Sequence, residues 1–108
     1  FKIIHCDEFQ TEGTDKIAER IKKRVGDNAL YLSIDIDVLD PAFAPGTGTP
    51  EIAGMTTREM VNVLRGLSGL NLISADVVEV APAYDHAEVT SLAAATIVYE
   101  LTNLFAKS

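Results

Sequence analysis

The sequence contains a single cysteine, no tryptophan and few basic residues, and these shortages exclude several classes of protein. With Cys6 alone there is no internal disulfide and no thiolate cage for a metal ion. The 9 Lys and Arg residues are outnumbered by 16 Asp and Glu residues, and the net charge of -7 argues against a surface for nucleic-acid phosphates. No apolar run is long enough to cross a membrane, since Leu92–Val98 is short and contains Thr96.

The composition is that of a globular protein. The chain is 47% apolar and 23% charged over 108 residues, which suits one domain with a modest core. Its basic cluster, from Arg20 to Arg24, is interleaved with Ile21 and reads as the solvated face of a helix. Cys6 lies in an apolar run and is expected to pack there as a small hydrophobe.

The start of the chain indicates a piece of a longer polypeptide. It opens on Phe1 and passes directly into a strand-like run, with no initiator Met and no leader. We expect a cytoplasmic parent protein.

Strand-like and helix-like runs alternate along the sequence. The three predicted strands are Phe1–Cys6, Ala29–Asp37 and Leu72–Val80. The three predicted helices run from about Asp15 to Val25, from about Thr56 to Leu67 and from about Ala87 to Phe105. This order predicts βαβ units, and therefore an α/β fold with a parallel sheet.

Local signals support the helices. Thr14 is a candidate cap for the first, and Thr56-x-x-Glu59 is a capping box for the second. The last helix is apolar around much of its surface, which is typical of a buried helix. Three strands cannot bury it well, so further chain or a partner is expected to cover it.

Two carboxylates lie at the end of the middle strand. Ser33, Asp35 and Asp37 alternate with apolar residues, so we expect them to share one face of the strand. Like charges beside a core repel each other and lose hydration, and a divalent metal would offset both costs. The alternative is a strand end open to water, where the paired aspartates are merely solvated.

A third carboxylate and a long loop are expected at the same edge. Ligands of open parallel sheets bind beyond the carboxyl ends of the strands. Glu79 lies near the end of the third strand, and the loop from Val38 to Met55 leaves from the second. The topology therefore predicts that the three carboxylates converge on one rim.

Two motifs resemble those of the ureohydrolases, the arginase and agmatinase family. The first is Ser33-x-Asp35-x-Asp37-x-x-Asp40-Pro41 followed by the run Pro45–Pro50, and the second is the run Asp76–Asp85. The Ala-Pro-x-Tyr-Asp ending of the second is closer to agmatinase than to arginase. The resemblance implies a three-layer α/β/α fold with a parallel sheet, of which residues 1–108 are the C-terminal βαβαβα part.

The resemblance also implies the chemistry. The intact parent would hold two Mn²⁺ ions, with Asp35 bridging them and Asp37 binding one, while Glu79 and Thr49 contact the guanidino substrate. Such a site lowers the pKa of a bridging water from 15.7 towards about 7, so that hydroxide attacks the guanidinium carbon. The products are urea and an amine, and the best single substrate is agmatine, which yields putrescine.

The rest of the family's ligand set is missing from this chain. A His from a Gly-Gly-Asp-His-type motif and an Asp-x-His-x-Asp motif would lie upstream, and the family's proton-shuttling carboxylate belongs to the latter. The pair His5 and Asp7 has the wrong neighbours and is interpreted as a loop-edge pair. We therefore assign no catalytic residue within the chain, and expect the 108 residues alone to bind metal weakly and to be inactive.

Several other polar residues have more than one possible role. Asp76 is either a hydrogen-bonding residue near the cluster or part of an exposed sheet edge, and Asp40 is expected to order its own turn. Tyr84 and Asp85 either touch substrate or are structural. His86 caps the last helix, faces solvent or supports the site from behind.

Two rival functions account for parts of the sequence. A truncated, non-catalytic module would associate through its exposed apolar helix. A receiver-type signalling domain needs a Lys after a later strand, and the chain has none between Lys23 and Lys107. Family members form homo-oligomers, so we expect self-association of the parent.

Overall fold

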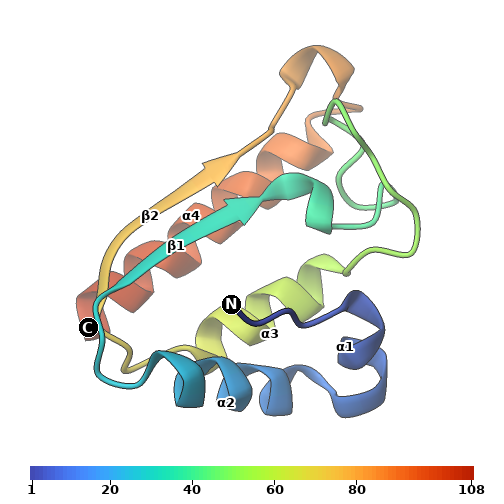
Figure 1. Ribbon diagram of the computed structural model, residues 1–108. Coiled ribbons are helices and arrows are strands. Elements are labelled where there is room, and N and C mark those ends of the chain that lie inside the picture. Colours follow the sequence, from blue (N-terminus) through green and yellow to red (C-terminus); the bar gives the residue numbers. More distant parts are fainter.

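The computed structural model describes all residues, 1–108, as a two-stranded parallel sheet with helices packed against it (Figure 1). In chain order the elements are α1 (Cys6–Glu12), α2 (Thr14–Val25), β1 (Leu30–Asp35), the 3-10 turn η1 (Ile36–Val38), α3 (Thr57–Gly66), β2 (Leu72–Val78), the 3-10 turn η2 (Pro82–Tyr84) and α4 (Val89–Lys107).

The strands β1 and β2 pair in parallel, with α3 as the crossover between them. Leu30 lies opposite Leu72, and after an irregularity Tyr31 lies opposite Ser74 and Asp35 opposite Val78. The α/β class and the parallel sheet predicted from the sequence are therefore confirmed, although each strand is shorter than predicted.

The predicted first strand is wrong. Residues Phe1 to His5 have no regular structure, and α1 begins at Cys6, with the His5 N–H donating to the Glu8 carboxylate at 2.6 Å. The backbone N–H and C=O groups of a strand need a neighbouring strand for their hydrogen bonds, whereas a helix such as α1 forms its hydrogen bonds within itself. Cys6 is consequently exposed, not packed, and its thiol lies 3.5 Å from the Ala53 carbonyl oxygen.

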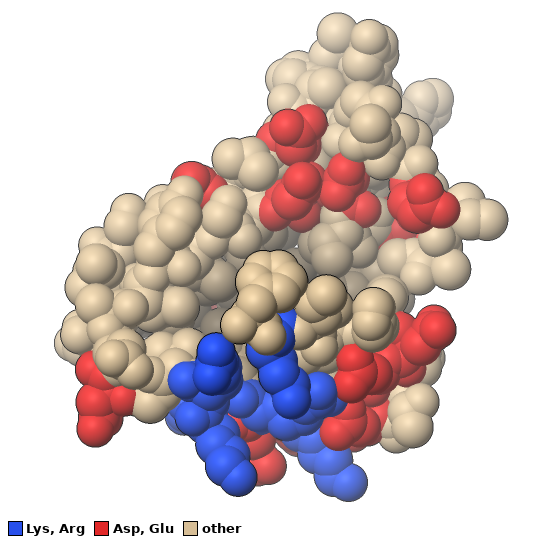
Figure 2. Space-filling view, viewed as in Figure 1, with Lys and Arg blue, Asp and Glu red and all other residues tan.

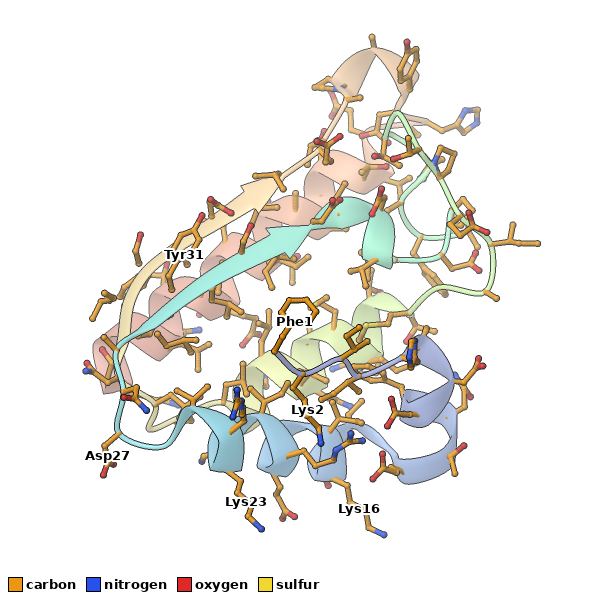
Figure 3. All side chains as sticks on the ribbon, in the orientation of Figure 1. Phe1, Lys2, Lys16, Lys23, Asp27 and Tyr31 are labelled. Atoms are coloured by element: carbon orange, nitrogen blue, oxygen red, sulfur yellow. The ribbon has the colours of Figure 1, made fainter.

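Helix α2 presents Lys23 and Arg24 to solvent, as predicted, whereas Arg20 and Lys22 are half-buried. Its apolar side buries Ile17 and Ala18, while Lys16 and Lys23 point away from the molecule (Figure 3). Arg20 forms ion pairs with Glu8 and Glu12 of α1, which joins the two helices. The N-cap is Gly13, so the predicted cap at Thr14 is one residue too late.

The core lies between the helices and one face of the sheet. Ile34 of β1, Leu64 of α3 and Ile97 of α4 belong to one buried cluster, which also includes Met55 and Met60. The Thr56 cap is confirmed, since its hydroxyl accepts a hydrogen bond from the Glu59 N–H at 3.0 Å. Helices α3 and α4 also contact each other directly.

The other face of the sheet is polar and bare. Tyr31 reaches from β1 to β2, where its hydroxyl donates to the Asp76 carboxylate (Figure 3). The Ser33 hydroxyl donates to the same carboxylate at 2.7 Å. Asp76 therefore shares a face with Ser33, and its hydrogen bonds hold its pKa below the ordinary value.

Helix α4 is only partly covered. Ala93, Ile97 and Leu101 are buried, but Leu92 is 69% exposed and Tyr99 is 65% exposed. Contrary to the sequence estimate, α4 is long and apolar enough to span a bilayer by length and composition alone. Its packing on β2 and α3 is that of a core helix with one side uncovered.

Candidate active-site rim

Three carboxylates meet where the two strands end. Asp35 is the last residue of β1, Asp37 lies in η1 and Glu79 follows β2 directly. Figure 2 shows acidic side chains gathered near the carboxyl ends of the strands, with the basic side chains over α2. Asp35, Asp37 and Glu79 thus lie at the same edge of the sheet, without forming a group of three that could hold a metal ion.

Hydrogen bonds leave part of each carboxylate free. The Asp37 N–H donates to Asp35 Oδ1 at 3.1 Å, and the Thr49 hydroxyl donates to Asp37 Oδ2 at 2.7 Å. No hydrogen bond reaches the second oxygen of either aspartate, and none reaches the Glu79 carboxylate. These oxygens are available to a ligand.

The charge at the rim is not compensated. Burial raises the pKa of Asp35, and the neighbouring charges of Asp37 and Glu79 raise that pKa further, against a lowering by the Asp37 N–H. The ion pairs of the structure lie elsewhere, on Arg20 and Arg65. Neighbouring carboxylates with no basic side chain as a partner favour the binding of positive charge.

The backbone at Glu79 departs from strand geometry. Val78 pairs with Asp35, so strict alternation would direct Glu79 to the opposite face of the sheet. Instead Glu79 has a positive φ of 69°, in the left-handed region that non-glycine residues rarely adopt. This conformation ends the alternation and keeps Glu79 within electrostatic range of Asp35.

Asp40 organises the loop that follows the rim. Its carboxylate accepts from the Ala42 N–H at 2.9 Å and from the Ala53 N–H at 3.0 Å. The first bond is the predicted Asx-type turn, and the second closes the loop on itself. The Asp40 N–H also donates to the Met55 carbonyl at 2.8 Å, so both ends of the loop are held together.

Asp85 is structural. Its carboxylate accepts from the N–H groups of His86, Thr90 and Ser91, each at 2.9 Å, and so caps the start of α4. Burial pushes the pKa of Asp85 upwards, but these hydrogen bonds outweigh it and hold the pKa far below its ordinary value. His86 and Tyr84 are exposed, so the structure supports the solvent-facing role for His86.

Sequence reasoning missed two residues that tie the loop to the rest of the site. The Gly46 N–H donates to the Thr90 hydroxyl at 2.7 Å, and the Gly46 carbonyl accepts from the Ala81 N–H at 2.7 Å. A threonine at the start of an apolar helix was the available signal, but its partner lies on a distant loop. The neighbouring Thr47 hydroxyl is buried and has no hydrogen-bond partner.

The rim has suitable donors for a hard divalent cation but too few of them. Carboxylate oxygens are the ligand type that Mn²⁺ and Mg²⁺ take, at about six donors per ion. No group of three or more metal-ligating side chains is assembled within this chain. Asp35 and Asp37 therefore fit as part of a metal site that other residues would complete.

Comparisons with known proteins point to one family. The sequence model of the arginase family matches residues 1–103. The chain is 61% identical over 108 residues to a protein of Schizosaccharomyces pombe that is named as an agmatinase, and it covers 27% of that protein.

Solved structures with the same arrangement include a hypothetical agmatinase from Burkholderia thailandensis, with a TM-score of 0.95, 47% identity and coverage of 97% of this chain and 33% of the other. Proclavaminate amidino hydrolase from Streptomyces clavuligerus gives a TM-score of 0.96 and 43% identity, covering 98% of this chain and 35% of the other. The chain spans about a third or less of the length of these relatives.

Proposed function

The chain belongs to the arginase family, and we propose that it supplies part of the active site of a ureohydrolase that cleaves a guanidino compound into urea and an amine. The observation that carries this proposal is the rim itself. Asp35, Asp37 and Glu79 lie at one edge of the sheet with no Lys or Arg partner, and the Thr49 hydroxyl donates a hydrogen bond to Asp37.

Glu79 is the residue we assign to the substrate guanidinium. Its carboxylate makes no ion pair or hydrogen bond within the chain and is exposed at the rim. A guanidinium binds a carboxylate through charge-assisted hydrogen bonds, often two in parallel. Binding there would place the guanidinium carbon beside Asp35 and Asp37, which is the orientation that hydrolysis needs.

Asp35 and Asp37 are the residues we assign to Mn²⁺. When bound, Mn²⁺ supplies water activation and positive charge at neutral pH. Within the chain, the Asp37 N–H fixes one oxygen of Asp35 and Thr49 fixes one oxygen of Asp37, so each carboxylate is oriented before it meets a ligand. The leaving amine needs a proton donor, which we expect from residues outside this chain.

Agmatine is the substrate we favour. The yeast and Burkholderia relatives carry agmatinase names, whereas the Streptomyces relative is named for proclavaminate. All these names fit a guanidino group at Glu79 and differ in the remainder of the substrate. Residues beyond the rim would recognise the part of the substrate outside its guanidino group.

The test compares the full-length polypeptide that carries this chain with the 108 residues alone. After loading with Mn²⁺, urea release is measured with agmatine, arginine and guanidinobutyrate. We expect release by the full-length protein with agmatine, and a Glu79→Gln variant that raises KM by about 10²-fold through loss of the charged partner.

The matched control for Glu79 is Glu51→Gln, which removes an exposed carboxylate from the loop beyond Thr49. No urea from any guanidino compound with the Mn²⁺-loaded full-length protein would refute the assignment. That result would favour the non-catalytic alternative, an association module, whose support is the exposed apolar side of α4.

A further inference from the structure

Gly46 joins three parts of the molecule at one peptide group. Its N–H donates to the hydroxyl of Thr90 on α4, and its carbonyl accepts from the N–H of Ala81 after β2. Thr90 is 0% exposed, so water cannot replace its hydroxyl in this contact. A buried N–H that loses its acceptor is costly, which makes this bond a firm constraint on the loop.

Packing reinforces the hydrogen bonds. A Cβ atom at Gly46 would lie 2.8 Å from Asp85 Cβ and 2.9 Å from Asp85 Cα, so the backbone of the loop lies directly against Asp85. Asp85 is itself fixed by the N–H groups of Thr90 and Ser91. Gly46 of the loop, Asp85 of the turn and Thr90 at the start of α4 therefore form one rigid unit, which we call the junction.

The junction is connected to the rim by two short segments. Glu79 lies two residues before Ala81 and has the left-handed backbone described above. In the other direction, Gly46 leads through Thr47 and Gly48 to Thr49, whose hydroxyl is bonded to Asp37. A shift of Gly46 would therefore displace the proposed guanidinium-binding residue and the partner of a proposed metal ligand together.

We propose that Thr90 is a positioning residue of the site: its buried hydroxyl holds Gly46 so that Glu79 and the Asp35–Asp37 pair keep the spacing that hydrolysis requires. Thr90 lies in the first turn of α4 and acts through Gly46, without contact to the substrate. This inference rests on the ureohydrolase function proposed above.

Two substitutions at Thr90 separate its hydroxyl from its volume. Thr90→Val keeps the shape and removes the acceptor, which leaves the Gly46 N–H unpaired. Thr90→Ser keeps the acceptor and removes a methyl group. Thr102→Val makes the same chemical change as Thr90→Val at an exposed position of the same helix, where the hydroxyl bonds only to the Val98 carbonyl.

The experiment measures kcat and KM for agmatine with these variants of the Mn²⁺-loaded full-length protein, below the unfolding temperature of each. A misplacement of about 1 Å costs a rate factor of order 10². We expect Thr90→Val to lower kcat by about 10-fold to 10²-fold with KM within threefold, because a displaced Glu79 still pairs with the guanidinium but aims its carbon poorly.

Rescue by the conservative variant distinguishes positioning from general stability. Thr90→Ser should recover kcat to within about threefold of the parent, and Thr102→Val should match the parent. Thr90→Val with unchanged kcat would overturn the proposal. So would Thr90→Ser with the same loss as Thr90→Val, or a loss of activity that merely follows the unfolded fraction.

Hydrogen exchange of the 46–49 amides gives a readout that does not depend on activity. Faster exchange there in Thr90→Val than in Thr90→Ser supports the junction, and equal exchange in both overturns it. If the parent protein releases no urea but exchange at 46–49 still responds to Thr90→Val, the ureohydrolase function fails while the junction stands.

Discussion

Asp35 and Asp85 are two aspartates with opposite surroundings. Asp85 receives three backbone N–H groups at 2.9 Å and has a lowered pKa, whereas Asp35 receives one at 3.1 Å and has a raised pKa. The carboxylate of Asp85 caps and stabilises the start of α4. Asp35 faces two other carboxylates and has an oxygen without a donor.

This contrast distinguishes acidic residues that stabilise the fold from acidic residues whose oxygens remain available to a ligand. A carboxylate with several backbone donors stabilises its neighbourhood and has no capacity left for a cation. A carboxylate beside like charges destabilises the fold until a cation binds. Substitutions at the two kinds of acid should therefore affect different measurements.

The largest effect should follow Asp35→Asn in the full-length, Mn²⁺-loaded protein. Urea release should fall by at least about 10³-fold because a carboxylate ligand is lost. The unfolding temperature of the metal-free protein should not fall, since one of three clustered charges is removed. Asp7→Asn, an exposed acid on α1, is the control. A clear drop in the unfolding temperature of the metal-free Asp35→Asn variant would show that Asp35, like Asp85, stabilises the fold.

Asp85→Ala should show the reverse pattern. Removing the cap leaves the first N–H groups of α4 without acceptors and loosens the junction with Gly46, so the metal-free unfolding temperature should drop by roughly 5 °C. Thermal unfolding followed by circular dichroism measures this. Unchanged melting would mean that water replaces the cap at no cost.

A smaller, pH-dependent effect is expected for Glu100, a buried acid with a partner. The Arg65 guanidinium, at 2.7 Å, holds the pKa of Glu100 below its ordinary 4.5. The folded state therefore binds this proton less readily than the unfolded state. The resulting stability is complete above pH 4.5 and is lost as pH falls through the lowered pKa.

Glu100→Gln should lower stability by about 1 kcal/mol at neutral pH, a modest figure because Arg65 is solvent-exposed. The deficit should vanish in acid. Urea denaturation at several pH values measures it, with the exposed Glu88→Gln as control. A deficit that is constant with pH would show that packing, not the ion pair, is responsible.

The smallest effect should come from His86→Ala. The His86 side chain is exposed and makes no hydrogen bond, although it lies between Asp85 and α4. Its removal should change the unfolding temperature by less than about 1 °C and leave kcat and KM within twofold. A tenfold change in KM would give His86 a role in the site.

The sequence predicted those features that depend on neighbouring residues. The Thr56 cap and the turn at Asp40 follow from local spacing and were found. The parallel arrangement placed Asp35, Asp37 and Glu79 on one rim. The assignment of those residues to metal and substrate remains a prediction from family resemblance.

Features that depend on distant partners were not predictable in the same way. Phe1–Cys6 has the composition of a strand, but no strand of this chain pairs with it and α1 begins instead. The contact between Gly46 and Thr90 joins a loop to a helix, and neither segment indicates the other. The left-handed backbone at Glu79 likewise depends on its surroundings, because glutamate has no intrinsic preference for it.

The parallel pairing of β1 with β2 also has a kinetic consequence. Leu30 meets Leu72 only after the whole loop and α3 have been brought together, so this sheet must close a long stretch of chain before any ladder bond forms. Helices α2 and α3 are each held by hydrogen bonds between near neighbours in the chain, so each can form before the strands meet. We expect the folding rate to be limited by strand docking, and substitutions at Ile34 to slow folding more than equal truncations at Ile17.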